Sequence, residues 1–308
     1  MDGLTASELR AVLVMQAFSG VSLFSVFVLM ALGLAIIFGQ MGVINMAHGE
    51  ILTIGAYSTV AISELAARYA PGLVPYYFCF AVLIAFSVAF AVGWLLELGL
   101  IRFLYHRPLD SLVATWGVSL ILQQIFRLAF GAREVSATLP DWLLGSWQPT
   151  EALDIPLNGL FVLGLTVALS SCVYILMYRS RWGLEMRAAT QNRAMAGAAG
   201  IRTPRVDRLT FALGCGIAGV AGAAFTTIAS TGPTSGSLYI VDTFLVVVFG
   251  GAASLLGTFA SAFSIAQAQS ILEFFMTGSA AKVLTLTSVI AILMLRPEGL
   301  FAPKGRRA

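Results

Sequence analysis

Long runs without a charged side chain are the feature that most restricts how this chain can fold. A membrane-spanning helix needs about 20 mostly apolar residues to cross roughly 30 Å of hydrocarbon. The chain has 308 residues, of which 18 are basic and 15 acidic, and 58% are hydrophobic. Six segments lack charge altogether: residues 11–49, 69–96, 111–126, 155–178, 209–241 and 243–272. A water-soluble globule is therefore excluded, because such a composition would leave very large apolar patches in water.

The number of spans follows from these runs and from two shorter apolar stretches. Residues 51–63 and 283–295 extend to membrane length when flanking polar residues and a snorkelling Lys282 are included. We expect an all-α polytopic membrane protein with eight to nine transmembrane helices, and nine is the preferred number. Residues 1–308 are expected to form a single transmembrane domain.

The distribution of arginine predicts which loops face the cytoplasm. Residues 179–208 hold seven arginines against Glu185 and Asp207, and basic residues concentrate in short cytoplasmic loops. The C-terminal tail is also basic, so it is predicted to be cytoplasmic; its basic residues are Arg296, Lys304, Arg306 and Arg307. The N-terminus has no positive excess and is predicted to lie outside, as is the one sizeable outer loop, residues 131–157.

Two glycine-rich interruptions fall within the apolar segments, one in each half of the chain. Residues 38–57 contain Gln40, Asn45, His48 and Glu50 among four glycines, and residues 246–262 contain Gly250, Gly251 and Gly257. Ionisable groups at membrane depth are costly and mark functional sites by default, and paired breaks in related halves indicate a transport site. The candidate pathway residues are Asn45, His48, Gly49, Glu50, Tyr57, Gly250 and Gly251. The alternatives are helix packing through small residues and a simple interfacial turn.

Several catalytic and metal-binding functions lack their residues. Only two histidines occur, no HExxH spacing is present, and the cysteines stand isolated in apolar runs, so a metal site or other cofactor is not expected. Neither lysine follows a glycine, so the chain carries no Walker A lysine. No GxSxG motif occurs. We expect a transporter subunit that is not itself an enzyme.

The arginine-rich loop contains a short segment with little side-chain bulk, residues 194–200. Gly200, with Pro204 shortly beyond it, is a typical helix stop. Such a helix can fit a partner's groove while nearby arginines pair with acidic groups. A solvated basic loop, or one held by anionic lipid, explains the same composition.

Several motifs in order resemble one transporter family. They are MGVINMAHGE at 41–50, RWGLEMRAATQNRAMA at 181–196, RVDRLTF at 205–211, GIAGVAG at 216–222, YIVDTFLVVVFGG at 239–251 and RPEGLFAPKGR at 296–306. Together they resemble the permease subunits of the branched-chain amino acid and urea group of ABC importers, and are most similar to its urea members.

This resemblance implies an assembly on the bacterial inner membrane. It implies a second homologous permease subunit, two cytoplasmic ATP-binding subunits and an extracytoplasmic solute-binding protein. The segment Ala194, Met195 and Ala196, followed by Gly200 and preceded by Arg193, resembles the family's coupling motif. ATP binding would act through it to switch access across the membrane.

The expected substrate is urea, because a neutral solute needs no buried arginine. Glu50 could bind the ammonium group of an amino acid, but only Arg127, near a span end, is available for a carboxylate. Branched-chain amino acids and short-chain amides are the alternatives. A passive urea or ammonia channel is the alternative from another class.

Overall fold

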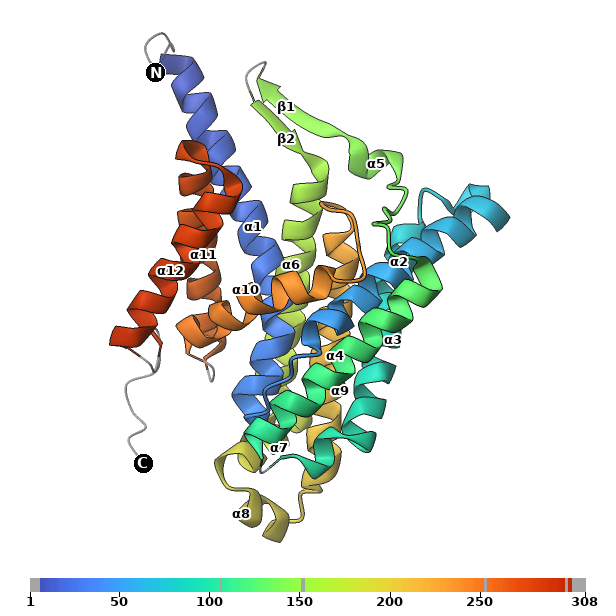
Figure 1. The fold of residues 1–308 in the computed structure, drawn as a ribbon, viewed down its shortest axis with the longest axis vertical. Helices are drawn as coiled ribbons and strands as arrows, with labels where there is room; N and C mark the ends of the chain where they lie inside the picture. Colours follow the sequence, from blue (N-terminus) through green and yellow to red (C-terminus); the bar gives the residue numbers. More distant parts are fainter. Residues whose placement is uncertain (1–5, 106, 151–152, 252–253, 297–298, 301–308) are drawn as a thin grey trace.

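A computed structural model describes residues 6–105, 107–150, 153–251, 254–296 and 299–300. Helices dominate this part of the chain (Figure 1). In chain order the elements are α1 (Ala6–Met41), α2 (His48–Tyr69), η1 (Pro71–Leu73), α3 (Tyr77–Gly99), η2 (Ile101–Phe103), α4 (Pro108–Phe130), α5 (Asp141–Leu144), β1 (Ser146–Thr150), β2 (Leu153–Pro156), α6 (Leu157–Arg179), α7 (Arg181–Gln191), α8 (Arg193–Ala198), α9 (Thr203–Phe225), α10 (Ser235–Gly250), α11 (Leu255–Phe275) and α12 (Gly278–Leu295).

The predicted fold class, an all-α polytopic membrane protein, is confirmed. Seven helical stretches in the described ranges are long and apolar enough to cross a membrane: α1, α3, α4, α6, α9, α11 and α12. This number is smaller than the expected eight to nine spans, and helices α2 and α10 account for the difference. Helix α10 has 16 residues, or about 24 Å, and lies across the other helices in Figure 1. Helix α2 has 22 residues but is more polar.

Helices α1 and α9 form the centre of the molecule, and the other spans surround them. In the most apolar window of α9, 83% of residues are buried, against 17% in α4 and α12. Small residues explain this packing, because glycine lets helix backbones approach closely. A Cβ atom at Gly219 would lie 2.4 Å from the carbonyl oxygen of Ala85, and one at Gly222 would lie 1.9 Å from that of Leu52.

Both predicted breaks are present. Helix α1 ends at Met41, Gly42 adopts a φ of +66°, and α2 begins at His48. In the second half, α10 ends at Gly250 and Gly251 has a φ of +87°, a left-handed conformation that favours glycine. Each break therefore separates a buried helix from the one that follows.

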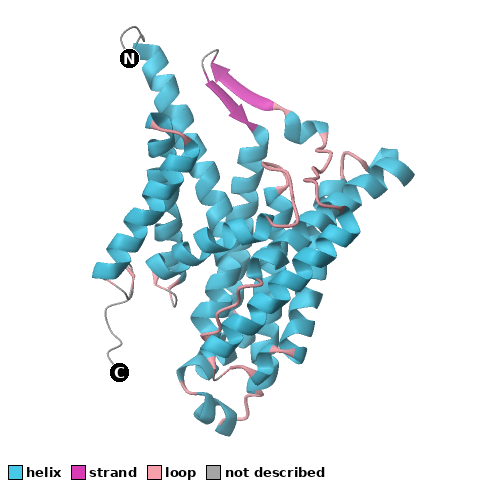
Figure 2. Ribbon diagram, in the orientation of Figure 1, coloured by secondary structure: helices cyan, strands magenta, loops and turns pink. Residues whose placement is uncertain are grey.

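The two ends of the molecule carry different structures. In Figure 1 the start of α1 and the β1–β2 hairpin lie at one end, and α7 and α8 lie at the other. Figure 2 shows this hairpin as the strand pair of the described residues. The loop before it is pinned to the body, because Trp142 Nε1 donates to the carbonyl of Pro75 at 2.7 Å. This arrangement fits the predicted outer loop at 131–157 and cytoplasmic loop at 179–208, and their sidedness stays a prediction.

The predicted cytoplasmic C-terminus falls mostly outside the described residues. Lys304, Arg306 and Arg307 belong to residues 301–308, which the structure does not describe. Helix α12 ends at Leu295, just before Arg296.

Candidate functional site

The carboxylate of Glu50 joins three helices. Its Oε1 atom accepts hydrogen bonds from Ser119 Oγ at 2.8 Å and Gln123 Nε2 at 2.9 Å, both on α4, and from Ser237 Oγ on α10 at 2.8 Å. Glu50 is 1% exposed, and its Oε2 atom has no hydrogen-bond partner among the described residues. The first break thus places an acidic group at the junction of α2, α4 and α10.

A close approach of two helix N-termini creates this junction. A Cβ atom at Gly49 would lie 2.3 Å from the carbonyl oxygen of Gly236, and one at Gly236 would lie 2.3 Å from that of Gly49. Gly236 also faces Glu50, because its Cβ would lie 2.5 Å from Oε2. The first turns of α2 and α10 therefore meet, and the positive ends of both helix dipoles favour the Glu50 anion.

This close approach gives a stability prediction. Gly236→Ala adds a Cβ that meets backbone atoms of Gly49, so we expect a loss of about 1–3 kcal/mol in unfolding free energy. The thermal midpoint of the purified protein measures this loss. Gly164→Ala on α6 is the matched control, because its Cβ meets no atom of the described residues within 4 Å. An unchanged midpoint for Gly236→Ala would contradict the observed contact.

Helix α4 presents a regular polar stripe to the first break. Its members recur every four residues, a spacing that keeps them on one helix face; they are Ser111, Thr115, Ser119 and Gln123, and we call them the α4 seam. Ser111 Oγ donates to the carbonyl of Ile44 at 3.4 Å, and Thr115 Oγ1 accepts from Met46 N at 3.0 Å. The opposite face of α4 is apolar and exposed. Polar contacts therefore hold α4 against the break.

Asn45 and Tyr57 lie on either side of Glu50 along the chain, and both are buried. Asn45 Oδ1 accepts from Ala47 N at 3.1 Å, which shapes the turn before α2. Tyr57 stacks on Phe130 of α4 with 4.2 Å between ring centroids. Asn45 Nδ2 and the Tyr57 hydroxyl have no hydrogen-bond partner in the described part of the chain.

His48 does not join the Glu50 cluster. Its Nε2 atom lies 3.4 Å from the carbonyl oxygen of Met30 on α1, and its ring adjoins Gly33. Residues two positions apart on a helix point to different sides. His48 therefore faces α1, whereas Glu50 faces α4 and α10, and the structure separates two residues that the sequence analysis grouped.

Gly250 and Gly251 also lie away from the cluster. They end α10, 13 residues beyond Ser237, or about 20 Å along the helix. A Cβ at Gly250 would lie 2.5 Å from backbone atoms of Gly257, so the second break is packed against the start of α11. The first break contacts the opposite end of α10.

The sequence analysis missed the residues that complete the cluster, namely Ser119, Gln123 and Ser237. The available signal was the spacing of four between polar residues inside an uncharged run. Lys282, which was expected to snorkel from the end of its span, instead places Nζ 2.7 Å from the buried carboxylate of Asp242. Arg127 is exposed near the end of α4, whereas the described donors to Glu50 are Ser119, Gln123 and Ser237. In the described ranges, no group of three or more His, Cys, Asp or Glu could hold a metal ion.

The predicted coupling segment forms α8, a six-residue helix. Asn192 Oδ1 caps its N-terminus by accepting from Met195 N at 3.0 Å. Gly200, with a φ of +87°, ends it in a Schellman motif, in which Ile201 N donates to the carbonyl of Ala196 and Gly200 N to that of Gly197. Cap and stop together define a short, rigid projection.

The face of α8 that partners could reach differs from the sequence expectation in one residue. Ala196 is 5% exposed and packs inward, whereas Ala194 and Gly200 are exposed and Met195 is 66% exposed. Arg193 is half-exposed, pairs with Asp207 of α9, and lies over the Tyr105 ring at 5.2 Å. Arg193 therefore ties α8 to the body of the protein.

A second ion pair extends this connection to α3. Arg208 Nε lies 2.8 Å from Glu97 Oε2, and Tyr105 Oη donates to Glu97 Oε1 at 2.8 Å. Glu97 is 1% exposed. Burial, reinforced by the Glu97 carboxylate, raises the pKa of Tyr105, so its hydroxyl stays protonated and can donate. The base of α8 is thus fixed to α3 and α9 by charge.

Breaking this buried pair should be costly. Arg208→Met leaves Glu97 buried without its cation, so we expect a loss of about 3–5 kcal/mol in unfolding free energy. Denaturant or thermal unfolding measures it, and adding Glu97→Gln should restore part of the loss. Arg107→Met is the matched control, because the Arg107–Asp110 pair is exposed and worth about 1 kcal/mol or less. Equal losses for Arg107→Met and Arg208→Met would contradict this assignment.

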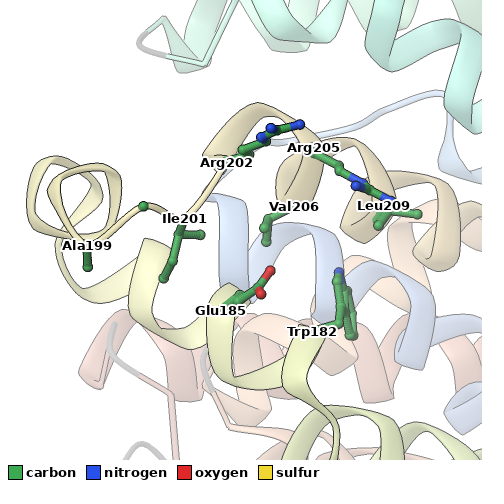
Figure 3. Close-up of a pocket in the computed structure, with 9 residues that line it drawn as sticks. Trp182, Glu185, Ala199, Ile201, Arg202, Arg205, Val206 and Leu209 are labelled. Carbon is green, nitrogen blue, oxygen red and sulfur yellow. The ribbon is translucent and has the colours of Figure 1, made fainter.

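A groove of about 560 Å³ lies beside α8, between α7 and the start of α9. Figure 3 shows Arg202 and Arg205 on one side of it and Glu185 and Trp182 on the other. The Trp182 indole N–H is buried without a partner among the described residues. The groove and α8 form one continuous surface at this end of the molecule.

Comparisons with a protein family and with individual relatives all match permeases of branched-chain amino acid transport systems. Residues 16–295 match the family described as branched-chain amino acid transport system, permease component. The high-affinity branched-chain amino acid transport system permease LivH of Salmonella typhimurium is 29% identical over 92% of this chain and 94% of its own length. A probable LivH of Methanocaldococcus jannaschii is 26% identical, over 89% and 87%. BraD of Pseudomonas aeruginosa is 26% identical, over 92% and 94%. No solved structure matches the chain significantly.

Proposed function

Because the chain belongs to the family of branched-chain amino acid transport permease components, we propose that it is the membrane subunit of an ATP-driven importer for branched-chain amino acids. The observation that carries the substrate class is the Glu50 centre. A buried carboxylate with one oxygen that has no partner among the described residues suits an ammonium group, since charge-assisted hydrogen bonds are the strongest available.

Branched-chain amino acids replace urea as the preferred substrate. The urea expectation rested on the absence of a buried arginine for a substrate carboxylate. Donors that could bind a substrate carboxylate instead surround Glu50, on the side chains of Ser119, Gln123 and Ser237. The three relatives described above are named for branched-chain amino acid transport, and none of their names supports urea.

The proposed partners are a second homologous permease subunit, two cytoplasmic ATP-binding subunits and an extracytoplasmic solute-binding protein. The surface that would meet the ATP-binding subunits comprises α8 and its groove, through Arg193, Ala194 and Gly200, with Ala196 supporting it from beneath. Arg202 and Arg205 in the groove could pair with acidic groups of such a subunit. The protein would lie in the bacterial inner membrane with its N-terminus outside and its C-terminus in the cytoplasm.

The proposed mechanism is alternating access. Closure of the ATP-binding subunits would push α8, and the pairs of Arg193 with Asp207 and Arg208 with Glu97 would carry that motion into α9 and α3. Packed helices respond to such a push by shifting between discrete arrangements. The site near Glu50 would then face alternate sides of the membrane.

Uptake by the reconstituted complex tests this function. The complex with its binding protein, placed in proteoliposomes with internal ATP, is expected to accumulate labelled leucine. Omission of ATP is the control, because a passive channel would conduct without it. Accumulation of urea without leucine would overturn the proposed substrate, and leucine flux that ignores ATP would overturn the proposed mechanism.

A further inference from the structure

The hydrogen bonds of Glu50 are unevenly divided between its two oxygens. Oε1 receives three donors, while Oε2 receives none within the described ranges, and the side chain is 1% exposed. A buried polar atom without a partner costs about 1–3 kcal/mol. A folded protein can retain such an atom where a bound ligand supplies the missing hydrogen bond. Oε2 is therefore suited to a donor that the chain itself does not provide.

The donors around Oε1 form a receptor for a carboxylate. Ser119 and Ser237 donate from opposite walls, and Gln123 Nε2 also donates to Ser237 Oγ at 2.8 Å, which orients that hydroxyl. Hydroxyl and amide donors bind a carboxylate without adding charge. In the structure, Glu50 itself occupies this receptor.

We propose that the junction of α2, α4 and α10 is a zwitterion-binding site, in which Glu50 binds the substrate ammonium group and Ser119, Gln123 and Ser237 transfer from Glu50 to the substrate carboxylate. This inference rests on the function proposed above. In the empty site Glu50 substitutes for the substrate carboxylate. In the loaded site the amino acid is inserted between Glu50 and the three donors.

The exchange balances charge and hydrogen bonds. A zwitterion adds no net charge to a buried site. Glu50 gains the substrate ammonium group as its partner. The three donors around it gain the substrate carboxylate. A carboxylate without an ammonium group would place two negative charges together in a poorly solvated site. An ammonium compound without a carboxylate would leave the three donors without their new acceptor. The site is therefore expected to require both charged groups of the substrate.

Helix α4 is the wall that can open. Only 17% of its most apolar window is buried, and the α4 seam contacts residues 44–50 through hydroxyl and amide groups, whereas Tyr57 stacks on Phe130 at the end of α4. Water or substrate can replace such hydrogen bonds on separation, whereas separating an apolar interface would expose hydrocarbon surface to water. Movement of α4 would uncover Ser119, Gln123 and Glu50 together.

Protection of introduced cysteines tests this site directly. In a background with the exposed Cys79 and Cys172 changed to alanine, Ser119→Cys is placed in the purified complex and treated with a charged methanethiosulfonate. Leucine at ten times its half-protecting concentration is expected to slow labelling about tenfold. Leucinamide and 4-methylpentanoate at that concentration should not protect. Arg133→Cys in the exposed segment just after α4 is the control, and its labelling should not depend on leucine.

Ser237→Cys reports from the opposite wall and replaces Ser119→Cys if the latter does not assemble. Leucine uptake by the same preparation is measured in parallel, so that the site and the function can fail separately. Uptake of leucine without protection of either cysteine overturns the site and leaves the function. Equal protection by leucinamide or 4-methylpentanoate also overturns it. Uptake of urea without leucine, with protection by urea alone, overturns both.

Discussion

Glu50→Gln is expected to abolish most leucine uptake while leaving the protein folded. Glutamine has the same shape, and its Oε1 atom can still accept from Ser119 and Ser237. It lacks the negative charge, however, and carries an NH₂ donor where Oε2 would face an ammonium group. Loss of one partner of a buried charge pair costs 2–5 kcal/mol or more. We therefore expect uptake at subsaturating leucine to fall about 100-fold, measured in proteoliposomes containing the complete complex.

Glutamine separates a binding role from a structural one. If Glu50 only holds α2 against α4 and α10 through hydrogen bonds, Glu50→Gln keeps those bonds and should transport normally. Glu50→Ala removes them and should unfold at a lower temperature. Glu64→Gln is the matched control, because Glu64 is an exposed carboxylate on the same helix. Wild-type uptake per ATP hydrolysed in Glu50→Gln would show that the first break is a packing turn.

Glu50 could be identified from the sequence because an acidic residue inside an uncharged segment has few explanations. Its partners could not be identified in the same way. Hydroxyl groups are common in membrane helices because they can bond to the carbonyl four residues earlier, as Thr115 Oγ1 does with Ser111 at 2.8 Å. Their composition therefore does not reveal which of them face a neighbouring helix.

The residues at which α2 and α10 begin explain why His48 and the pair Gly250 and Gly251 lie away from Glu50. With 45–50 as an open turn, His48 and Glu50 could share one site. The helix begins at His48, and two residues of helix rotate their side chains to different faces. Gly250 and Gly251 were grouped with Glu50 through the likeness of the two halves. The sequence did not show that α10 would meet the first break by its N-terminus, which leaves these glycines at its far end.

The position of α8 in the chain could be predicted from the sequence, but the side of the helix that is exposed could not. A run of alanine and glycine has no amphipathic pattern, so nothing in it marks Ala196 as buried and Ala194 as exposed. The end of the helix at Gly200 was predicted, because glycine is a typical C-terminal stop, whereas the Asn192 cap is known from the structure. The structure adds the Arg193–Asp207 pair, which sets the orientation of α8 on the body.

Ala194→Trp is expected to uncouple the protein from its ATP-binding partners. Ala194 is exposed on α8, so the indole would project from the surface where a partner is proposed to fit. A misfit that costs about 1.4 kcal/mol or more reduces association tenfold. We expect ATP hydrolysis stimulated by the loaded binding protein, and leucine uptake with it, to fall at least about tenfold. Membrane insertion and the thermal midpoint of the isolated subunit should be unchanged.

Three further variants show whether such a loss comes from docking or from α8 itself. Ala194→Ser adds one oxygen atom and should remain coupled. Ala196→Trp should lower stability, because Ala196 is buried. Gly200→Trp meets open space but must adopt a φ of +87°, which costs about 1–2 kcal/mol for an L-residue, so it should disturb both the stop of α8 and the coupling. Normal coupling in both Ala194→Trp and Gly200→Trp would remove α8 from the partner interface. Since Arg193 would still join α8 to α9, the helix would then serve only to close the loop between α7 and α9.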